Sequence, residues 1–144
     1  MTDQQHTAPT RSKPSAIVFY DGFCAVCSSA VGWIIDHDPD ALIKFAPLQG
    51  STASQAKLDP GSFSIDSLVY VSNLGIATES TAVRMILGSL GTPAPHLAGV
   101  MSLIPTTVAD SIYRLVAKRR HMISKRLDRS CRIPADEDRS RFLA

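Results

Sequence analysis

The chain has 144 residues, of which 44% are hydrophobic and 19% charged, as in ordinary globular proteins. Its net charge of +2 indicates no strongly charged partner, and three cysteines in a chain of this length exclude a disulfide scaffold. This length favours one domain with its own hydrophobic core. We expect that domain over residues 16–134, between a disordered N-terminal tail (1–15) and a polar C-terminal tail (135–144).

The N-terminal tail is polar, contains Pro9 and Pro14, and lacks the apolar segment of a signal peptide. No run in the chain approaches about 18 apolar residues, so we expect no transmembrane segment. These features predict a cytoplasmic protein. In that reducing compartment a C-x-x-C pair is more often catalytic or metal-binding than a structural disulfide.

The first predicted elements are a buried strand over 16–20 and a helix that ends near Asp36. The strand is a short apolar run, whereas the helix has apolar residues at helical spacing. Proline in the segment His37-Asp38-Pro39-Asp40 breaks the helix, and a second strand follows over 42–46. A strand–helix–strand unit of this kind predicts parallel pairing with a right-handed crossover.

Two thiols, Cys24 and Cys27, stand where the first strand passes into the first helix. The first turn of a helix has unpaired N–H groups and a partial positive charge, which stabilise a thiolate. We therefore predict that Cys24 is open to solvent and has a pKa below the free value of about 8.5. Cys27 follows one turn later, within reach of the Cys24 sulfur. This placement is typical of a dithiol redox centre, in which Cys24 attacks a disulfide and Cys27 resolves the mixed disulfide.

The second half of the chain continues the same fold. A strand over 67–71, a turn and a return strand over 76–78 predict a hairpin, and a helix then runs from Glu79 to Gly91. The signal is weak over 47–64 and 93–105, and a last helix is expected from about Thr106 to Arg126. This order predicts an α/β thioredoxin-like sandwich, a βαβ unit followed by a β-hairpin and a helix, with an added C-terminal basic helix.

The stretch Tyr20-Asp21-Gly22-Phe23-Cys24-Ala25-Val26-Cys27 resembles the D-x-x-C-x-x-C signature of the thiol-disulfide oxidoreductase DCC family, a thioredoxin-like group. Weaker matches are Phe45-Ala46-Pro47-Leu48-Gln49, Pro105, Tyr113, Arg120 and the closing motif Cys131-Arg132-Ile133-Pro134. The likeness covers roughly residues 16–134. It implies a thioredoxin-like fold and dithiol–disulfide exchange, with Cys24 and Cys27 as the redox pair.

One departure concerns the substrate groove. Ordinary thioredoxins place a cis-proline directly before the strand that faces the dithiol, where it helps to present a substrate backbone. Here Ser64-Ile65-Asp66-Ser67 precedes that strand, and the nearest proline is Pro60. The groove is therefore built differently or is absent.

Asp21 has two interpretations. As a catalytic group it would shuttle the proton during resolution by Cys27. As a structural group it would accept backbone hydrogen bonds in the turn before Gly22, and this interpretation is slightly favoured. Arg120 is a candidate for a buried ion pair with Asp21 or with another acid.

Cys131 also has several interpretations: a distal resolving cysteine, a ligand in a Cys₃-type metal site, or a small buried hydrophobe, of which the last is favoured. The four histidines, His6, His37, His96 and His121, lack metal-ligand spacing to the C-x-x-C. No second C-x-x-C supplies further ligands, so we expect no metal site.

The last predicted helix is strongly basic. Between Arg114 and Arg132 lie eight Lys and Arg residues and a single acid, Asp128. We expect it to bury one apolar stripe, because apolar residues recur at helical spacing at Ile112, Leu115, Val116, Met122, Ile123 and Leu127. A solvated basic face accounts for most of the charge. Contact with a partner or an anionic membrane surface is the less favoured interpretation, and no nucleic-acid-binding motif accompanies the charge.

The sequence thus predicts a thiol-disulfide oxidoreductase with Cys24, Cys27 and Asp21 as catalytic residues. Its partners would be a protein or small-molecule disulfide or thiol and a dithiol electron donor, and it would need no cofactor. Two other hypotheses stay open. One is a non-catalytic binding or metal-holding module with a structural C-x-x-C and a basic docking helix. The other is a redox sensor whose disulfide changes shape without turnover.

Overall fold

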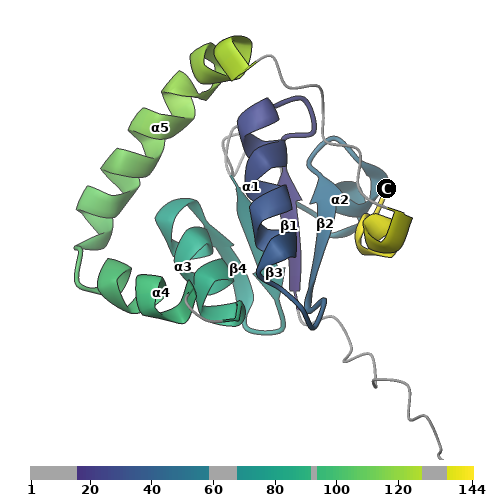
Figure 1. The fold of residues 1–144 in the computed structure, drawn as a ribbon, viewed down its shortest axis with the longest axis horizontal. Coiled ribbons are helices and arrows are strands. Elements are labelled where there is room, and N and C mark those ends of the chain that lie inside the picture. Colours follow the sequence, from purple (N-terminus) through teal and green to yellow (C-terminus); the bar gives the residue numbers. More distant parts are fainter. Residues whose placement is uncertain (1–15, 59–67, 92–93, 128–135) are drawn as a thin grey trace, which may run out of the picture.

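The computed structural model describes residues 16–58, 68–91, 94–127 and 136–144 (Figure 1). Its elements are, in chain order, β1 (Ala16–Tyr20), α1 (Ala25–Asp36), β2 (Ile43–Pro47), α2 (Ser51–Gln55), β3 (Val69–Ser72), β4 (Gly75–Thr78), α3 (Glu79–Ser89), α4 (Ala94–Ser102), α5 (Thr106–Leu127) and the 3₁₀ helix η1 (Asp136–Arg141). The predicted βαβ unit, hairpin and helices are present. The segments without a clear prediction contain α2 and α4. The expected N-terminal tail, Pro60, the segment 64–67 and Cys131 with its closing motif lie outside the described residues.

The four strands form one mixed sheet in the order β2-β1-β3-β4. β1 and β2 are parallel, with Ala16 opposite Ile43 and Tyr20 opposite Pro47, which confirms the predicted pairing. β3 is antiparallel to both β1 and β4. The architecture is the expected thioredoxin-like α/β fold.

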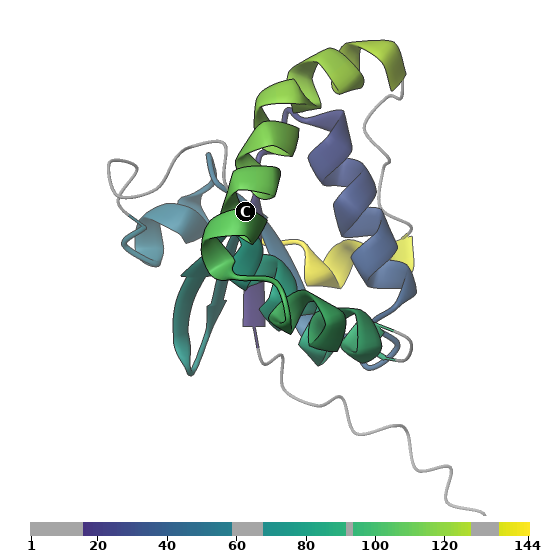
Figure 2. The same cartoon turned by 90° about the vertical axis from the view of Figure 1, so that its left-hand side faces the viewer.

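The sheet is covered on both faces, as Figure 2 shows with α1 and α2 on opposite sides of the strands. Alternate residues of the central strands point to alternate faces. Val18, Phe45 and Tyr70 lie on the face that α1, α3 and α4 cover. Phe19 and Val69 pack on the other face with α2. Because both faces are buried, β1 is a continuous apolar run rather than an alternating one.

The structure differs from the expected C-terminal tail over the residues 136–144. Phe142 pairs with Phe45 of β2 in a parallel bridge, and their rings lie 5.6 Å apart. The Leu143 N–H then donates to the Phe45 carbonyl at 2.8 Å. These residues are therefore an edge addition to β2. Three apolar residues after a charged segment are too short a signal to be recognised in the sequence.

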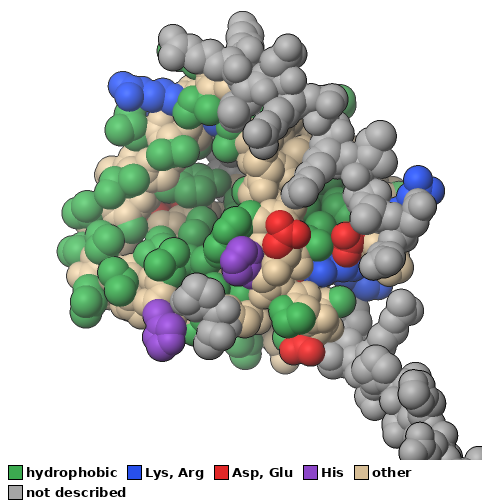
Figure 3. Space-filling model, viewed as in Figure 1, with side chains coloured by type: hydrophobic (Ala, Val, Ile, Leu, Met, Phe, Trp, Pro, Cys, Tyr) green, Lys and Arg blue, Asp and Glu red, His purple; other side chains and the backbone are tan. Residues whose placement is uncertain are grey.

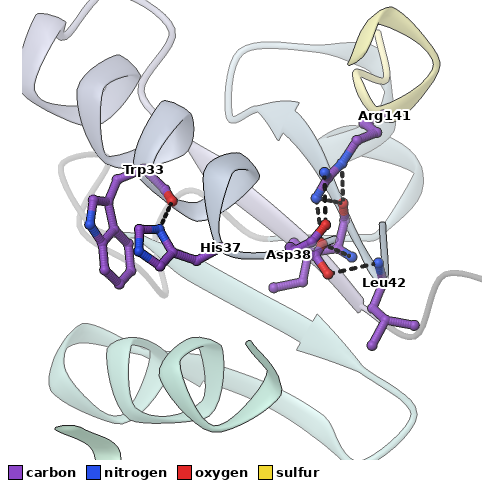
Figure 4. Close-up of polar contacts among 6 residues, drawn as sticks. Trp33, His37, Asp38, Leu42 and Arg141 are labelled. Atoms are coloured by element: carbon purple, nitrogen blue, oxygen red, sulfur yellow. Dashed lines mark hydrogen bonds and ion pairs between the residues drawn. The ribbon is translucent and has the colours of Figure 1, made fainter. Parts of the chain in front are cut away.

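A buried ion pair fastens this C-terminal segment (Figure 4). The Arg141 guanidinium pairs with the Asp38 carboxylate, and both side chains are almost fully buried. Arg141 also donates through Nε and Nη2 to the Ile43 carbonyl at 3.2 and 3.1 Å. Asp38 in turn accepts the N–H groups of Leu42 and Ile43 at 3.1 and 3.0 Å. The pair thus connects the loop before β2 to the end of the chain.

We expect Arg141→Met to lower the free energy of unfolding by about 3–5 kcal/mol, because it leaves the Asp38 carboxylate buried without its cation. Urea denaturation monitored by circular dichroism measures this change. Arg139→Met is the matched control on the same 3₁₀ helix, since Arg139 is exposed and we expect a loss of about 1 kcal/mol or less. Equal losses in both variants would show that the Asp38–Arg141 pair does not anchor this segment.

The expectation that α5 buries an apolar stripe is wrong. Five of the six residues expected in that stripe are exposed, as is Val108, and the side chain of the sixth, Leu127, lies outside the described part of the chain; the five are Ile112, Leu115, Val116, Met122 and Ile123. The inner face of α5 is instead formed by Asp110, Tyr113 and Ala117, which are half-buried, and by Arg120, which is buried. Their spacing of three and four residues gives one helical face, and its polar groups find hydrogen-bond partners in the domain.

Among the described helices, none has both the length and the apolar character needed to cross a membrane.

Candidate functional site

The turn between β1 and α1 places Cys24 at the N-cap of the helix. The Cys24 N–H donates to the Asp21 carbonyl at 3.2 Å, and the Asp21 carboxylate accepts the Phe23 N–H at 3.0 Å. Cys24 has an extended backbone, and its carbonyl accepts the Ser28 N–H, the first bond of the helix, at 3.0 Å. The leading thiol therefore lies at the helix N-terminus, as the sequence predicts.

The two thiols are free and hydrogen-bonded to each other. Burial, the hydrogen bond to Cys24 and the charge of Cys24 together raise the pKa of Cys27 to about 12, against an opposing effect of Arg120. Cys27 therefore keeps its proton at neutral pH.

Solvent exposure is the reverse of what was expected. Cys24 is only 1% exposed, whereas Cys27 is partly exposed. The prediction of a solvent-open Cys24 is wrong for this conformation. The thiol is a small, weakly polar group that is readily buried like a hydrophobic residue.

A cation from α5 reaches both Asp21 and the dithiol. Arg120 Nη2 lies 3.3 Å from Asp21 Oδ2, and its Nη1 donates to Cys27 Sγ at 3.6 Å. Both members of the ion pair are buried, with Asp21 8% and Arg120 4% exposed. The proposed ion pair between these two residues is confirmed. The hydrogen bond expected of a structural Asp21 is also present, in the turn, whereas proton transfer by Asp21 stays a prediction.

Gln49 also belongs to the site, although the sequence does not predict it as a site residue. Its Nε2 donates to Asp21 Oδ1 at 3.1 Å, and its Oε1 accepts the Gly22 N–H at 3.4 Å. Because β2 is parallel to β1, the carboxyl ends of the two strands meet, and the Leu48 N–H donates to the Tyr20 carbonyl at 2.9 Å. This parallel pairing, together with the family-like stretch 45–49, was the signal that could have identified it.

Tyr113 lies on the same face of α5 as Arg120, about two turns earlier. Its hydroxyl accepts the Leu68 N–H at 2.8 Å, next to the start of β3. Burial raises the pKa of Tyr113, the hydrogen bond from Leu68 opposes this, and the charge of Cys27 adds a further increase. One turn earlier, Asp110 accepts the Ser80 N–H at 3.3 Å. Polar contacts thus orient the helix that carries Arg120.

The alternative of a metal site has no support in the described parts of the chain, where no group of three His, Cys, Asp or Glu residues is arranged to hold a metal ion. Cys131 lies outside them, so its roles stay untested. His37 is engaged elsewhere: its ring stacks on Trp33 at 4.1 Å, and its Nδ1 lies 2.8 Å from the Trp33 carbonyl (Figure 4). That contact closes the C-terminal end of α1, remote in sequence from Cys24.

Comparison with known proteins gives a consistent result. The family model described as DCC1-like thiol-disulfide oxidoreductase matches residues 18–126. The uncharacterized protein YuxK of Bacillus subtilis (strain 168) is 31% identical over 132 residues, which cover 90% of this chain and 95% of that protein. The DCC family protein At1g52590, chloroplastic, of Arabidopsis thaliana is 33% identical over 119 residues, or 81% of this chain and 69% of that protein. No solved structure matches the chain significantly.

Proposed function

Because the chain belongs to the DCC1-like thiol-disulfide oxidoreductase family, we propose that it exchanges disulfides through Cys24 and Cys27. The observation that carries the proposal is the hydrogen-bonded dithiol at the N-terminus of α1, with Arg120 within 3.6 Å of the Cys27 sulfur. The substrate would be a disulfide on a protein or a small molecule. A reducing compartment such as the cytoplasm suits this chemistry, because it keeps the dithiol supplied with electrons.

In the first step the Cys24 thiolate attacks one sulfur of the substrate disulfide. A bond forms between Cys24 and that sulfur, the substrate S–S bond breaks, and the other substrate sulfur leaves as a thiolate that takes up a proton. The unpaired N–H groups and partial positive charge at the start of α1 favour the negative charge on Cys24. Cys27 is hydrogen-bonded to Cys24 and is thus in place for the second step.

In the second step Cys27 must lose its proton and attack Cys24. Two of the causes that raise the pKa of Cys27, its hydrogen bond to Cys24 and the charge on Cys24, disappear once Cys24 is bound in a mixed disulfide. Burial, the largest cause of the raised pKa, remains, and so does the lowering effect of Arg120, so Cys27 loses its proton more readily at this stage than in the free dithiol. Its attack forms the Cys24–Cys27 disulfide and releases the second substrate thiolate. The protein has then lost two electrons to the substrate, and an external dithiol must return them.

Access to Cys24 requires a local movement, because this residue is 1% exposed in the reduced protein. The adjacent Phe23 is 88% exposed, so it contributes little packing that would resist displacement of the turn. Asp21 holds the other side of the turn through its hydrogen bond to the Phe23 N–H and its ion pair with Arg120. We assign Asp21 first to positioning Arg120. Proton transfer by Asp21 is the less favoured proposal, since both of its oxygens are already engaged.

The test of this proposal is to trap the intermediate. We expect Cys27→Ser to accumulate a mixed disulfide between Cys24 and a disulfide-bonded reporter peptide, because no second thiol resolves it. Intact-mass spectrometry with peptide mapping identifies the linked cysteine. The wild-type protein under the same conditions should release both peptide thiols and form the Cys24–Cys27 disulfide instead. Attachment of the peptide at Cys131, or to neither thiol, would contradict the proposed order of attack.

The burial of Cys24 favours a second candidate, a redox sensor whose disulfide changes shape rather than turning over. Oxidation would replace the Cys27 S–H contact by a covalent bond beside Arg120 and the turn. A sensor should have a reduction potential close to the glutathione poise of its compartment. Equilibration with glutathione buffers followed by thiol counting measures that potential, and a value far from the poise would leave only the exchange function.

A further inference from the structure

The outer surface of α4 and α5 is apolar and has no partner among the described elements. Its exposed side chains, with that of Leu103 in the connection between the two helices, are Leu97, Val100, Val108, Ile112, Leu115, Val116, Met122 and Ile123. Figure 3 shows apolar side chains gathered over these two helices on one side of the molecule. We call this set the α4–α5 face. An exposed apolar area spread over two helices is typical of an interaction surface rather than of scattered surface residues.

The charges on these helices are almost all of one sign. Lys118 and Arg119 are exposed, and on a helical projection Arg119 falls within the apolar arc of α5. Arg114 is exposed too, but its guanidinium pairs with Glu79 at 3.0 Å. Asp110 is the only acid in the sequences of α4 and α5, and it bonds Ser80 on the inner side. A partner on the α4–α5 face must therefore bring apolar contact and negative charge together.

We propose that the α4–α5 face docks onto an anionic phospholipid surface. α5 has 22 residues, so about 33 Å of helix would lie in the plane of the interface. Its aliphatic side chains would enter the boundary between headgroups and acyl chains, while Lys118 and Arg119 extend their charged ends to the lipid phosphates. The dithiol is not needed for this docking, so the inference stands apart from the proposed exchange reaction.

Charge argues against a second copy of the chain as the occupant. Lys118 and Arg119 lie close to the middle of α5, so an antiparallel pairing of two α5 helices would place like charges against each other. No acid on the face would neutralise them. The residue types argue against a protein partner of another kind, because the two helices contain no Phe or Trp and Tyr113 faces inward. Aromatic residues are the usual anchors of protein interfaces.

Vesicle sedimentation tests the proposal on the full chain. We expect binding to mixed phosphatidylcholine–phosphatidylglycerol vesicles and little binding to pure phosphatidylcholine vesicles. Lys118→Glu and Arg119→Glu should each weaken binding about fivefold or more, since each replaces a cation of the interface by an anion. Ile112→Gln with Leu115→Gln should weaken it about tenfold, and both positions are exposed enough to tolerate the change. Cys24→Ser should bind as the wild type does.

Lys57→Glu is the matched control, because it makes the same charge change at an exposed position outside the α4–α5 face. Binding that falls equally in Lys57→Glu and Arg119→Glu would overturn the proposal, as would equal binding to neutral and mixed vesicles or no binding to either. Light scattering without vesicles tests whether a second copy of the chain occupies the α4–α5 face instead. A stable dimer that Ile112→Gln with Leu115→Gln converts to a monomer would assign the face to a second copy and refute lipid docking.

Discussion

Replacing Cys24 with serine should abolish disulfide exchange and leave the domain folded. The thiolate is the nucleophile, and a serine hydroxyl in its place does not attack sulfur, so we expect at least about a thousandfold loss of activity. Serine is among the preferred N-cap residues, and Cys24 occupies the N-cap of α1. We therefore expect the free energy of unfolding to stay within about 1 kcal/mol of the wild type. Turnover of a fluorogenic disulfide substrate and urea denaturation measure the two quantities.

Two further variants make this result specific. Cys27→Ser should retain the first exchange step and lose turnover, so the two serine variants differ in what accumulates. Cys131→Ser is the control for loss of a cysteine outside the dithiol, and we expect it to keep full activity. Equal accumulation of the mixed disulfide in Cys24→Ser and Cys27→Ser, or turnover retained by Cys24→Ser, would refute the assignment of Cys24 as the nucleophile.

Replacing Arg120 with methionine should cost about 3–5 kcal/mol in the free energy of unfolding. The substitution keeps much of the side-chain volume but leaves the Asp21 carboxylate, 8% exposed, without its cation. Arg119→Met is the matched control one residue away, because Arg119 is exposed, and its effect should be about 0.5 kcal/mol or less. Urea denaturation of both variants measures the difference.

A double variant separates the buried charge from the lost packing. Asp21→Asn together with Arg120→Met removes both charges, so it should be more stable than Arg120→Met alone. Arg120→Met should also raise the pKa of Cys27, because Arg120 is the group that lowers it. The resolving step would then slow, and the mixed disulfide should persist longer in single-turnover mass spectrometry. A loss of stability no greater than in Arg119→Met would show that the ion pair contributes nothing to the fold.

The strands and helices near the dithiol could be predicted from the sequence because their signals are local. β1 is a continuous apolar run, α1 has helical periodicity, and proline ends it at the predicted place. α2 has no such signal, since its sequence is Ser-Thr-Ala-Ser-Gln. It depends on tertiary contacts instead: the Thr52 N–H and the Ser51 hydroxyl both donate to the Ala144 carbonyl, at 2.7 and 3.1 Å.

For the site, the sequence alone determined the chemistry that its local motif carries: two thiols one turn apart at a helix N-terminus, after a turn that contains Asp21. Only the tertiary structure decided what surrounds them. The parallel pairing of β1 and β2 brings Gln49 to the turn, and the path of α5 brings Arg120 to Asp21 and Cys27. Periodicity shows that one face of a helix is apolar, but it does not show which face is buried. On α5 hydrogen bonds and an ion pair satisfy the polar face inside the domain, and the apolar face is left outside.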